Sequence, residues 1–208
     1  MQKNICAIIF DFGGVLLEWD PRRLYRRYFE QPREIDRFLA EINFQAWNLE
    51  QDRGRPFTQA VAELSAQFPQ HARLIRAYHE QWEESIVGPI PGTARILQQL
   101  KQAGFLLYGL SNWSHETFPL VHKKYPFFDL FDDIILSGAV ELVKPDPRIF
   151  QLTLDRIGRR ANECLLIDDS PANIASARDL GLATVQFHSS QQLERELHLL
   201  GLLKETYP

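Results

Sequence analysis

Polar side chains capable of chemistry stand where several apolar runs of the sequence end, or in the loops that follow. They are Asp11, Ser111, Asn112, Lys144, Asp168 and Asp169. In an open parallel sheet, ligands bind outside the carboxyl ends of the strands, so these groups are expected to meet at one edge. Each has an ordinary alternative as a turn, helix-cap or solvated residue. Their occurrence in this order at one edge favours a common site.

This set of side chains suits phosphoryl transfer through a covalent aspartyl intermediate. A carboxylate is a usable nucleophile toward phosphorus, and Asp11 at a strand end would be held in line for attack. Mg²⁺ prefers hard oxygen ligands, and it would neutralise the reacting groups if Asp11, a backbone carbonyl and Asp169 held it. Lys144 would hold the same phosphate, while Ser111 and Asn112 would donate hydrogen bonds to its oxygens.

The elements that must position these groups alternate between strand-like and helix-like segments. The strand-like apolar runs are 5–10, 105–110, 134–136, 164–167 and 183–187. Most are continuously hydrophobic, which is typical of strands covered on both faces of a parallel sheet. The helix-like stretches are 93–103, 147–157, 171–180 and one in the tail from residue 189. We therefore predict a three-layer α/β sandwich with a parallel sheet.

The interval from residue 20 to 88 breaks this alternation. It holds no convincing strand, but it holds three helix-like segments at roughly 21–43, 57–68 and 71–85, with breaks at Pro32 and around Gly54 and Pro56. We interpret it as a helical insertion after the first strand, with the Gly-Pro-Ile-Pro-Gly stretch at 88–92 as the return hinge. The predicted domains are a core of 1–18 and 89–208 and a small all-helical cap of 19–88.

Composition indicates an ordinary globular protein. Of the 208 residues, 45% are hydrophobic and 24% charged, and the formal net charge of -4 gives no basic footprint for nucleic acid. No apolar run approaches the ~18 residues that a membrane span needs, and the N-terminus lacks a signal-peptide pattern. Cys6 and Cys164 lie in strand-like runs, which indicates buried thiols. We therefore predict a cytoplasmic protein without a nucleic-acid or membrane partner.

Four stretches together resemble the ordered motifs of the haloacid dehalogenase superfamily. They are FDFGGVL at 10–16, LSN at 110–112, KPDPRIF at 144–150 and IDDSPANI at 167–174. The resemblance implies a Rossmannoid core with an all-helical cap of the first type. The catalytic residues it implies are Asp11 as nucleophile, Ser111 and Lys144. The substrate-binding residues would be Ser111, Asn112, Lys144 and Gly14. The Mg²⁺ site would comprise Asp11, the Gly13 carbonyl and Asp169, with Asp168 beside it.

The superfamily contains both phosphatases and dehalogenases. Dehalogenases in it typically place a Ser-Asn run where this chain has Asp168, Asp169 and Ser170. They need no metal, because their halide leaves from carbon. The double aspartate therefore favours a Mg²⁺-dependent phosphatase acting on a small phosphorylated metabolite.

Gly13 departs from the pattern, because most phosphatases of the superfamily carry there a second aspartate that protonates the leaving alkoxide. General acid–base catalysis typically contributes ~10²- to 10⁴-fold, so its loss would slow turnover. A subgroup with Asp-x-Gly in this motif includes sugar-phosphate phosphatases, which makes a sugar phosphate one expected substrate. The proton could come from substrate, from water, or from Glu50, Asp52 or Arg53, although that cluster also fits a solvated turn. His115 could likewise contact substrate or solvent.

Two further classes of function remain open at this level. A module that keeps the metal site but lacks the acid could bind a phosphorylated ligand without hydrolysing it. A phospho-receiver domain also uses aspartates, a hydroxyl and a lysine around Mg²⁺. Receivers, however, carry the acidic pair at the first strand and lack a helical insertion of this size, so the motif order speaks against that class.

Overall fold

The computed structural model describes residues 5–204 and contains a five-stranded parallel sheet in the order β5-β4-β1-β6-β7. The strands are β1 (Ala7–Phe10), β4 (Leu106–Ser111), β5 (Asp133–Leu136), β6 (Cys164–Asp168) and β7 (Ala183–Gln186). Each coincides with a strand-like run of the sequence, so the predicted α/β fold with a parallel sheet is confirmed. β1 occupies the centre, between β4 and β6.

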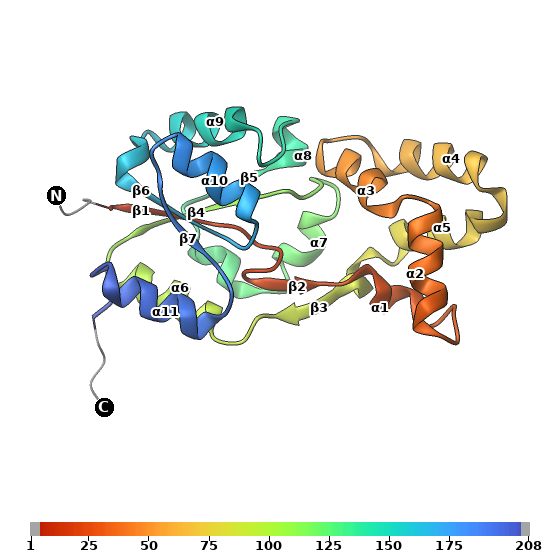
Figure 1. The fold of residues 1–208 in the computed structure, drawn as a ribbon, viewed down its shortest axis with the longest axis horizontal. Helices are drawn as coiled ribbons and strands as arrows, with labels where there is room; N and C mark the ends of the chain where they lie inside the picture. The colour runs from red at the N-terminus through yellow and green to blue at the C-terminus, as the bar shows by residue number, and fades with distance from the viewer. Residues whose placement is uncertain (1–4, 205–208) are drawn as a thin grey trace.

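Helices cover both faces of this sheet (Figure 1). Two lie on one face, α9 (Pro147–Ile157) and α10 (Pro171–Asp179), and two on the other, α6 (Thr93–Gln102) and α11 (Ser190–Leu199). Side chains of β1 alternate between the two sides: Ala7 and Ile9 belong to one buried cluster, and Ile8 and Phe10 to the other. The strands therefore read as continuous apolar runs because both faces are buried.

The helix termini follow local chemistry. α9 has a proline in its first turn, where no intrahelical partner for its nitrogen is needed, and the Asp146 side chain accepts a hydrogen bond from the Arg148 N–H. It ends at Gly158, whose φ of 63° lies in the left-handed region that glycine tolerates. The predicted bounds of 147–157 match the helix observed.

Residues 20–85 form a helical unit, here called the helical insertion, which a two-stranded antiparallel ribbon joins to the core. The ribbon consists of β2 (Leu17–Trp19) and β3 (Ile86–Pro89). The reading of residues 20–88 as holding no convincing strand was wrong at its end, where β3 begins at Ile86; β2 ends before this interval, at Trp19. These strands are short, β3 contains Gly88 and Pro89, and they pair only because the insertion brings its two ends together.

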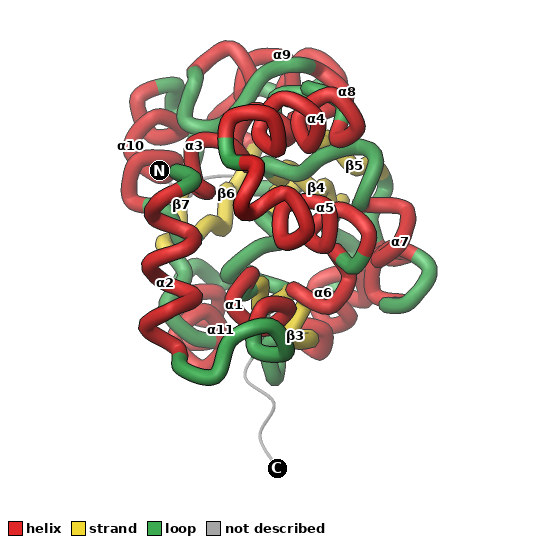
Figure 2. The backbone as a smooth tube through the Cα atoms, turned by 90° about the vertical axis from the view of Figure 1, so that its right-hand side faces the viewer, coloured by secondary structure: helices red, strands yellow, loops and turns green. Residues whose placement is uncertain are grey.

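The helical insertion contains more helices than its sequence indicated. They are α1 (Pro21–Tyr25), α2 (Pro32–Glu41), α3 (Phe44–Asp52), α4 (Phe57–Gln67) and α5 (Ala72–Glu80), with 3₁₀ turns at Pro69–His71 and Trp82–Ser85. The segment predicted at 21–43, with a break at Pro32, contains α1 and α2, and α2 begins at Pro32. The third helix, α3, lies partly in the stretch that also fitted a turn. Viewed from the side of the insertion, these helices lie in front of the sheet (Figure 2).

The remaining short elements connect the core strands. They are α7 (Phe118–His122), α8 (Ser137–Val140) and 3₁₀ turns at Pro126–Leu130 and Ala161–Glu163. Cys6 and Cys164 are free thiols; Cys164 is fully buried as expected, whereas Cys6 is only partly buried. Among residues 5–204, no helix is both long and apolar enough to cross a membrane.

Candidate active site

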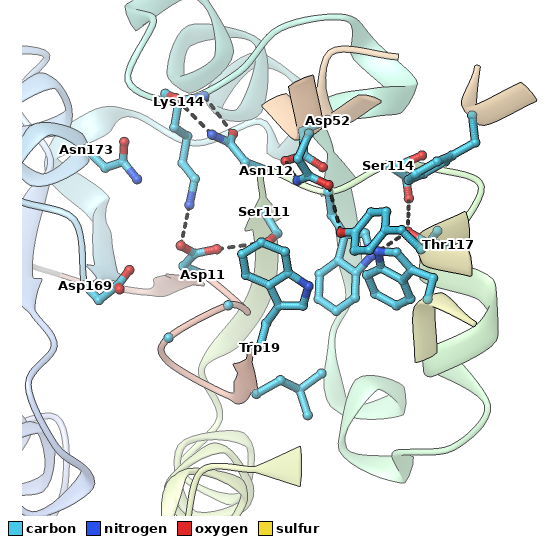
Figure 3. A pocket seen from close by; sticks show the side chains of 18 residues that line it. Asp11, Trp19, Asp52, Ser111, Asn112, Ser114, Thr117, Lys144, Asp169 and Asn173 are labelled. Atoms are coloured by element: carbon cyan, nitrogen blue, oxygen red, sulfur yellow. Dashed lines mark hydrogen bonds and ion pairs between the residues drawn. The ribbon is translucent and has the colours of Figure 1, made fainter. Parts of the chain in front are cut away.

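The polar side chains singled out from the sequence converge at the carboxyl edge of the sheet, where a cavity of about 360 Å³ opens toward the helical insertion (Figure 3). Ser111 and Asp168 are the last residues of β4 and β6, and Asp11 immediately follows β1. Seven of the eight predicted site residues line the cavity: Asp11, Gly13, Gly14, Ser111, Asn112, Lys144 and Asp169. Asp168 lies fully buried beneath them.

The Asp11 carboxylate is held by three neighbouring groups. One oxygen accepts hydrogen bonds from the Phe12 backbone N–H at 2.7 Å and from the Ser111 hydroxyl at 3.0 Å. The other oxygen lies 2.9 Å from Lys144 Nζ. Burial raises the pKa of Asp11, and the Lys144 ammonium opposes that shift. These contacts fix the orientation of a carboxylate that a ligand in the cavity can reach.

Lys144 is held between two carboxylates. Its Nζ lies 2.6 Å from Asp168 and 2.9 Å from Asp11, and the side chain is almost fully buried. Burial alone would lower the pKa of Lys144, but the two carboxylates outweigh it and the pKa is raised. The lysine therefore remains a cation at the cavity and can attract an anionic group.

Asp168 is occupied by hydrogen bonds within the protein. Besides Lys144, its oxygens accept from the Asn173 amide at 2.9 Å and from the Ser170 backbone N–H at 2.9 Å. These contacts favour a role in positioning Lys144 over direct ligation of a cation. Asn112 has a comparable setting, because its amide accepts from the Lys144 N–H at 2.8 Å and donates to the Lys144 carbonyl at 2.9 Å.

The acidic cluster has the composition of a divalent-cation site. Carboxylate oxygens of Asp11, Asp168 and Asp169 lie within 4.8 Å of one another. Burial, followed by repulsion from Asp168, raises the pKa of Asp169. A hard cation would relieve this repulsion, and the all-oxygen donor set suits Mg²⁺. The backbone hydrogen bonds next to Gly13 use the Phe12 carbonyl and the Gly14 N–H rather than the Gly13 carbonyl.

Gly14 is required by close approach to the acidic cluster. Its φ is +75°, and a Cβ atom there would lie 2.4 Å from Asp169 Oδ2. Gly13 is different, because a Cβ at that position would have nothing within 4 Å. The first glycine therefore leaves open space beside Asp11, whereas the second lets the backbone reach Asp169.

The side of the cavity facing the helical insertion is mainly apolar and aromatic. Its apolar and aromatic lining residues are Leu17, Trp19, Phe57, Tyr78, Trp82 and Trp113. Several polar groups of this wall are already paired: the Tyr78 hydroxyl donates to Asn48 at 2.8 Å, and the Trp113 indole donates to Thr117 at 3.0 Å. The wall thus offers few free groups to a ligand with many hydroxyls.

Of the three residues at 50–53 that could supply the leaving-group proton, one reaches the cavity. Glu50 and Arg53 pair with each other at 2.6 Å with about half of each side chain exposed, at 45% and 47% respectively. Asp52, at the end of α3, lines the cavity. His115 is exposed, and its Nδ1 lies 2.9 Å from the Gly138 carbonyl oxygen, so the solvent-facing alternative fits it better.

The sequence did not indicate which residues hold the helical insertion against the core. A Cβ at Gly54 would lie 2.9 Å from the Gly138 carbonyl, and Glu116 accepts a hydrogen bond from the Phe57 N–H at the start of α4. The Ser137 hydroxyl donates to the Asp52 carbonyl. No periodic pattern marks these contacts, because they join segments distant in the chain.

The fold and the site together define an α/β enzyme with an aspartate at the end of its central strand and an acidic cluster beside it. The chain belongs to the haloacid dehalogenase-like hydrolases, whose family model matches residues 5–181. This agrees with the family indicated by the four sequence motifs.

Individual relatives differ in their described activities. The chain is 36% identical over 195 residues to a drimenol cyclase of Aspergillus calidoustus, covering 92% of this chain but only 35% of the relative. It is 26% identical to a sesquiterpene phosphatase of Aspergillus oryzae, covering 96% of this chain and 98% of the relative. Over 116 residues it is 29% identical to (S)-2-haloacid dehalogenase 4A of Burkholderia cepacia, covering 56% of this chain and 48% of that protein.

A solved structure of the family shows a similar fold. A Bacteroides thetaiotaomicron enzyme in complex with magnesium and inorganic phosphate superposes with a TM-score of 0.72 at 24% identity. The match covers 89% of this chain and 95% of the other.

Proposed function

We propose that this hydrolase is a Mg²⁺-dependent phosphomonoesterase that acts through an aspartyl-phosphate intermediate. The observation that carries the proposal is Asp11, which Ser111 and Lys144 hold at the cavity with Asp169 nearby. The helical insertion would serve as the cap, consistent with a division into a core of 1–18 and 89–208 and a cap of 19–88. Such a cap shapes the substrate pocket and excludes water.

The reaction would proceed in two displacements at phosphorus. An Asp11 carboxylate oxygen forms a bond to phosphorus while the bond from phosphorus to the substrate alcohol oxygen breaks. Water then attacks the aspartyl phosphate, releasing inorganic phosphate and restoring Asp11. Lys144 and Ser111 would stabilise negative charge on the transferring group. Mg²⁺, held by Asp11, Asp169 and the Gly13 carbonyl, would supply positive charge that lets two anions approach.

Dehalogenation is the second candidate, because one of the relatives is a haloacid dehalogenase. In that reaction an Asp11 oxygen would displace a halide from carbon, and no cation would be needed. The close grouping of Asp11, Asp168 and Asp169 favours the phosphatase, because Lys144 supplies only one positive charge to three carboxylates. A module that binds a phosphorylated ligand without turnover is the third candidate.

The chemical class of the substrate follows from the wall of the cavity. The aromatic lining and the paired polar groups favour a phosphate monoester of a largely apolar alcohol over a sugar phosphate. A relative that is a sesquiterpene phosphatase and covers almost the whole chain supports the same class. The substrate would thus be a small phosphorylated metabolite with an apolar organic group.

A panel of phosphate monoesters tests this function. Phosphate release from alkyl, aryl, terpenoid and sugar phosphates would be measured with Mg²⁺ and with a chelator, alongside the corresponding 2-haloacids. We expect turnover of apolar monoesters that needs Mg²⁺ and falls about 10⁴-fold or more in Asp11→Asn. Turnover without Mg²⁺, or turnover that survives Asp11→Asn, would contradict the mechanism. Halide release would support the dehalogenase, and binding without turnover would support the third candidate.

A further inference from the structure

The position of Gly13 leaves a gap in the chemistry of the site. An alkoxide is a poor leaving group, so breaking its bond to phosphorus requires a proton donor at the departing oxygen. Gly13 has no side chain, and nothing lies within 4 Å of where its Cβ would be, so no neighbouring group occupies that position. Any protein-borne proton must therefore come from another group at the cavity.

The titratable side chains that line the cavity form a short set. They are Asp11, Asp52, Tyr78, Lys144 and Asp169. Asp11 is the nucleophile, Asp169 belongs to the cation-binding edge, and Lys144 is a cation bound to two carboxylates. The Tyr78 hydroxyl already donates to Asn48, and burial raises its pKa far above the ordinary value. Only Asp52 is left without one of these roles.

Asp52 is fixed to the core although it belongs to the helical insertion. Its backbone carbonyl accepts a hydrogen bond from the Ser137 hydroxyl, whose oxygen in turn accepts from the Trp113 N–H at 2.9 Å. Two residues farther on, Gly54 packs against the Gly138 carbonyl, where a Cβ would come within 2.9 Å. The loop that follows β4 and the start of α8, directly after β5, thus hold this residue at the cavity.

The surroundings of Asp52 favour its neutral form. Burial raises its pKa to about 7, while hydrogen bonds from the Ser114 backbone and the Asn48 amide only partly oppose the shift. The groups that face it are neutral: Asn48 on its own helix, Tyr78 on α5, Ser114 on the loop after β4, and Ser137 at the start of α8. A substantial fraction of Asp52 is therefore protonated near neutral pH, as a general acid requires.

We propose that Asp52 is the catalytic acid and base of this enzyme, supplying from the helical insertion the proton that Gly13 cannot. This inference rests on the proposed phosphomonoesterase function. As the bond from phosphorus to the alcohol oxygen breaks, the Asp52 carboxylic acid transfers its proton to that oxygen. The neutral alcohol leaves, and Asp52 becomes a carboxylate.

The second displacement returns the proton to Asp52. Water enters on the side of phosphorus opposite Asp11, which the alcohol has just left, so the same carboxyl group faces it. The Asp52 carboxylate takes a proton from this water as its oxygen bonds to phosphorus and the bond from phosphorus to Asp11 breaks. Asp52 is then a carboxylic acid again, and the protons balance over the cycle.

The test compares substrates whose leaving groups differ in their need for a proton. Asp52→Asn keeps the size and hydrogen-bonding capacity of the side chain but cannot transfer a proton. With Mg²⁺, we expect the rate on n-hexyl phosphate to fall about 10²- to 10⁴-fold. The rate on p-nitrophenyl phosphate, whose leaving group departs as a stable anion, should fall by less than about tenfold. Glu50→Gln on the same helix is the matched control and should leave both rates unchanged, because Glu50 is half exposed and lies outside the cavity lining.

Three further measurements separate acid catalysis from a structural role. The wild-type rate on n-hexyl phosphate should decline as the pH rises past about 7, and Asp52→Asn should remove that decline. The carboxyl carbon of Asp52 should titrate near the same pH in NMR spectra of the metal-free protein. In the Asp52→Asn background, Gly13→Asp should restore turnover of n-hexyl phosphate, because a side chain fits there.

The possible outcomes distinguish this inference from the proposed function. An equal loss on both substrates in Asp52→Asn, or an unchanged rate on n-hexyl phosphate, would overturn the role of Asp52 and leave the phosphatase intact. If wild-type enzyme hydrolyses neither ester with Mg²⁺, the proposed function itself fails. A circular dichroism spectrum and a melting temperature that match the wild type establish that the variant is folded.

Discussion

Replacing Gly14 with alanine should weaken both the fold and the cation site. The position has a φ of +75°, which costs an L-residue about 1–2 kcal/mol. The new Cβ would also lie 2.4 Å from Asp169 Oδ2, so the Asp169 side chain has to move away. Gly13→Ala is the control, because a Cβ there meets nothing within 4 Å.

The effect of Gly14→Ala on Mg²⁺ binding appears as a change in how much Mg²⁺ stabilises the folded state. At a Mg²⁺ concentration ten times the wild-type Kd, binding stabilises the folded state by about 1.4 kcal/mol. If displacement of Asp169 raises Kd tenfold, the stabilisation drops to about 0.4 kcal/mol. Urea unfolding with and without Mg²⁺ measures both quantities, the second as the difference between the two curves.

Two results would refute this reasoning about Gly14. If Mg²⁺ stabilises Gly14→Ala as strongly as the wild type, Asp169 does not contribute to the cation site from the position observed. If Gly13→Ala destabilises the metal-free protein as much as Gly14→Ala does, the loss does not arise from the left-handed backbone or from the contact with Asp169.

Other expected outcomes concern the buried charges. Lys144→Met should lower the free energy of unfolding by about 3–5 kcal/mol, because it leaves the Asp168 carboxylate buried without its cationic partner. A change below about 1 kcal/mol in urea unfolding would contradict this expectation. Because the pKa of Asp52 is raised in the folded state, the metal-free folded protein binds more protons than the unfolded chain between about pH 4 and pH 7. The stability that Asp52 contributes therefore declines as the pH rises through that range. The free-energy difference between wild type and Asp52→Asn, measured by urea unfolding in chelator across this range, should therefore decrease with pH, and a flat difference would exclude the shift. Asp11, whose pKa burial also raises, is common to both proteins and cancels in this comparison.

The parallel sheet could be predicted because its strands are buried on both faces. Runs such as the one ending at Phe10 are apolar at every position, which distinguishes them from half-exposed strands. The helices on the sheet also carry their own boundaries, with Pro147 at the start of α9 and Gly158 at its end. These are local properties, so they can be read without knowing which segments meet.

The helical insertion was harder to predict because its structure depends on contacts between distant segments. β2 and β3 pair only across the whole insertion, and Leu17 and Pro89 are partners in that ribbon. α3 is preceded by its N-cap residue Asn43, which adopts a left-handed φ of 48° and makes no side-chain cap hydrogen bond, so the helix start lacks the usual capping contact. Local propensity alone could not separate this helix from a turn.

The sequence alone determined the chemical identity and order of the polar groups at this edge: a carboxylate after the central strand, a hydroxyl, a lysine and an acidic pair. It could do so because the carboxyl ends of parallel strands share one edge. Tertiary structure decided which groups line the cavity and which lie outside its lining, as when Asp168 accepts hydrogen bonds from Lys144 and Asn173. It also separated Asp52 from its neighbours in the sequence, because burial against core loops far along the chain sets both its position and its pKa.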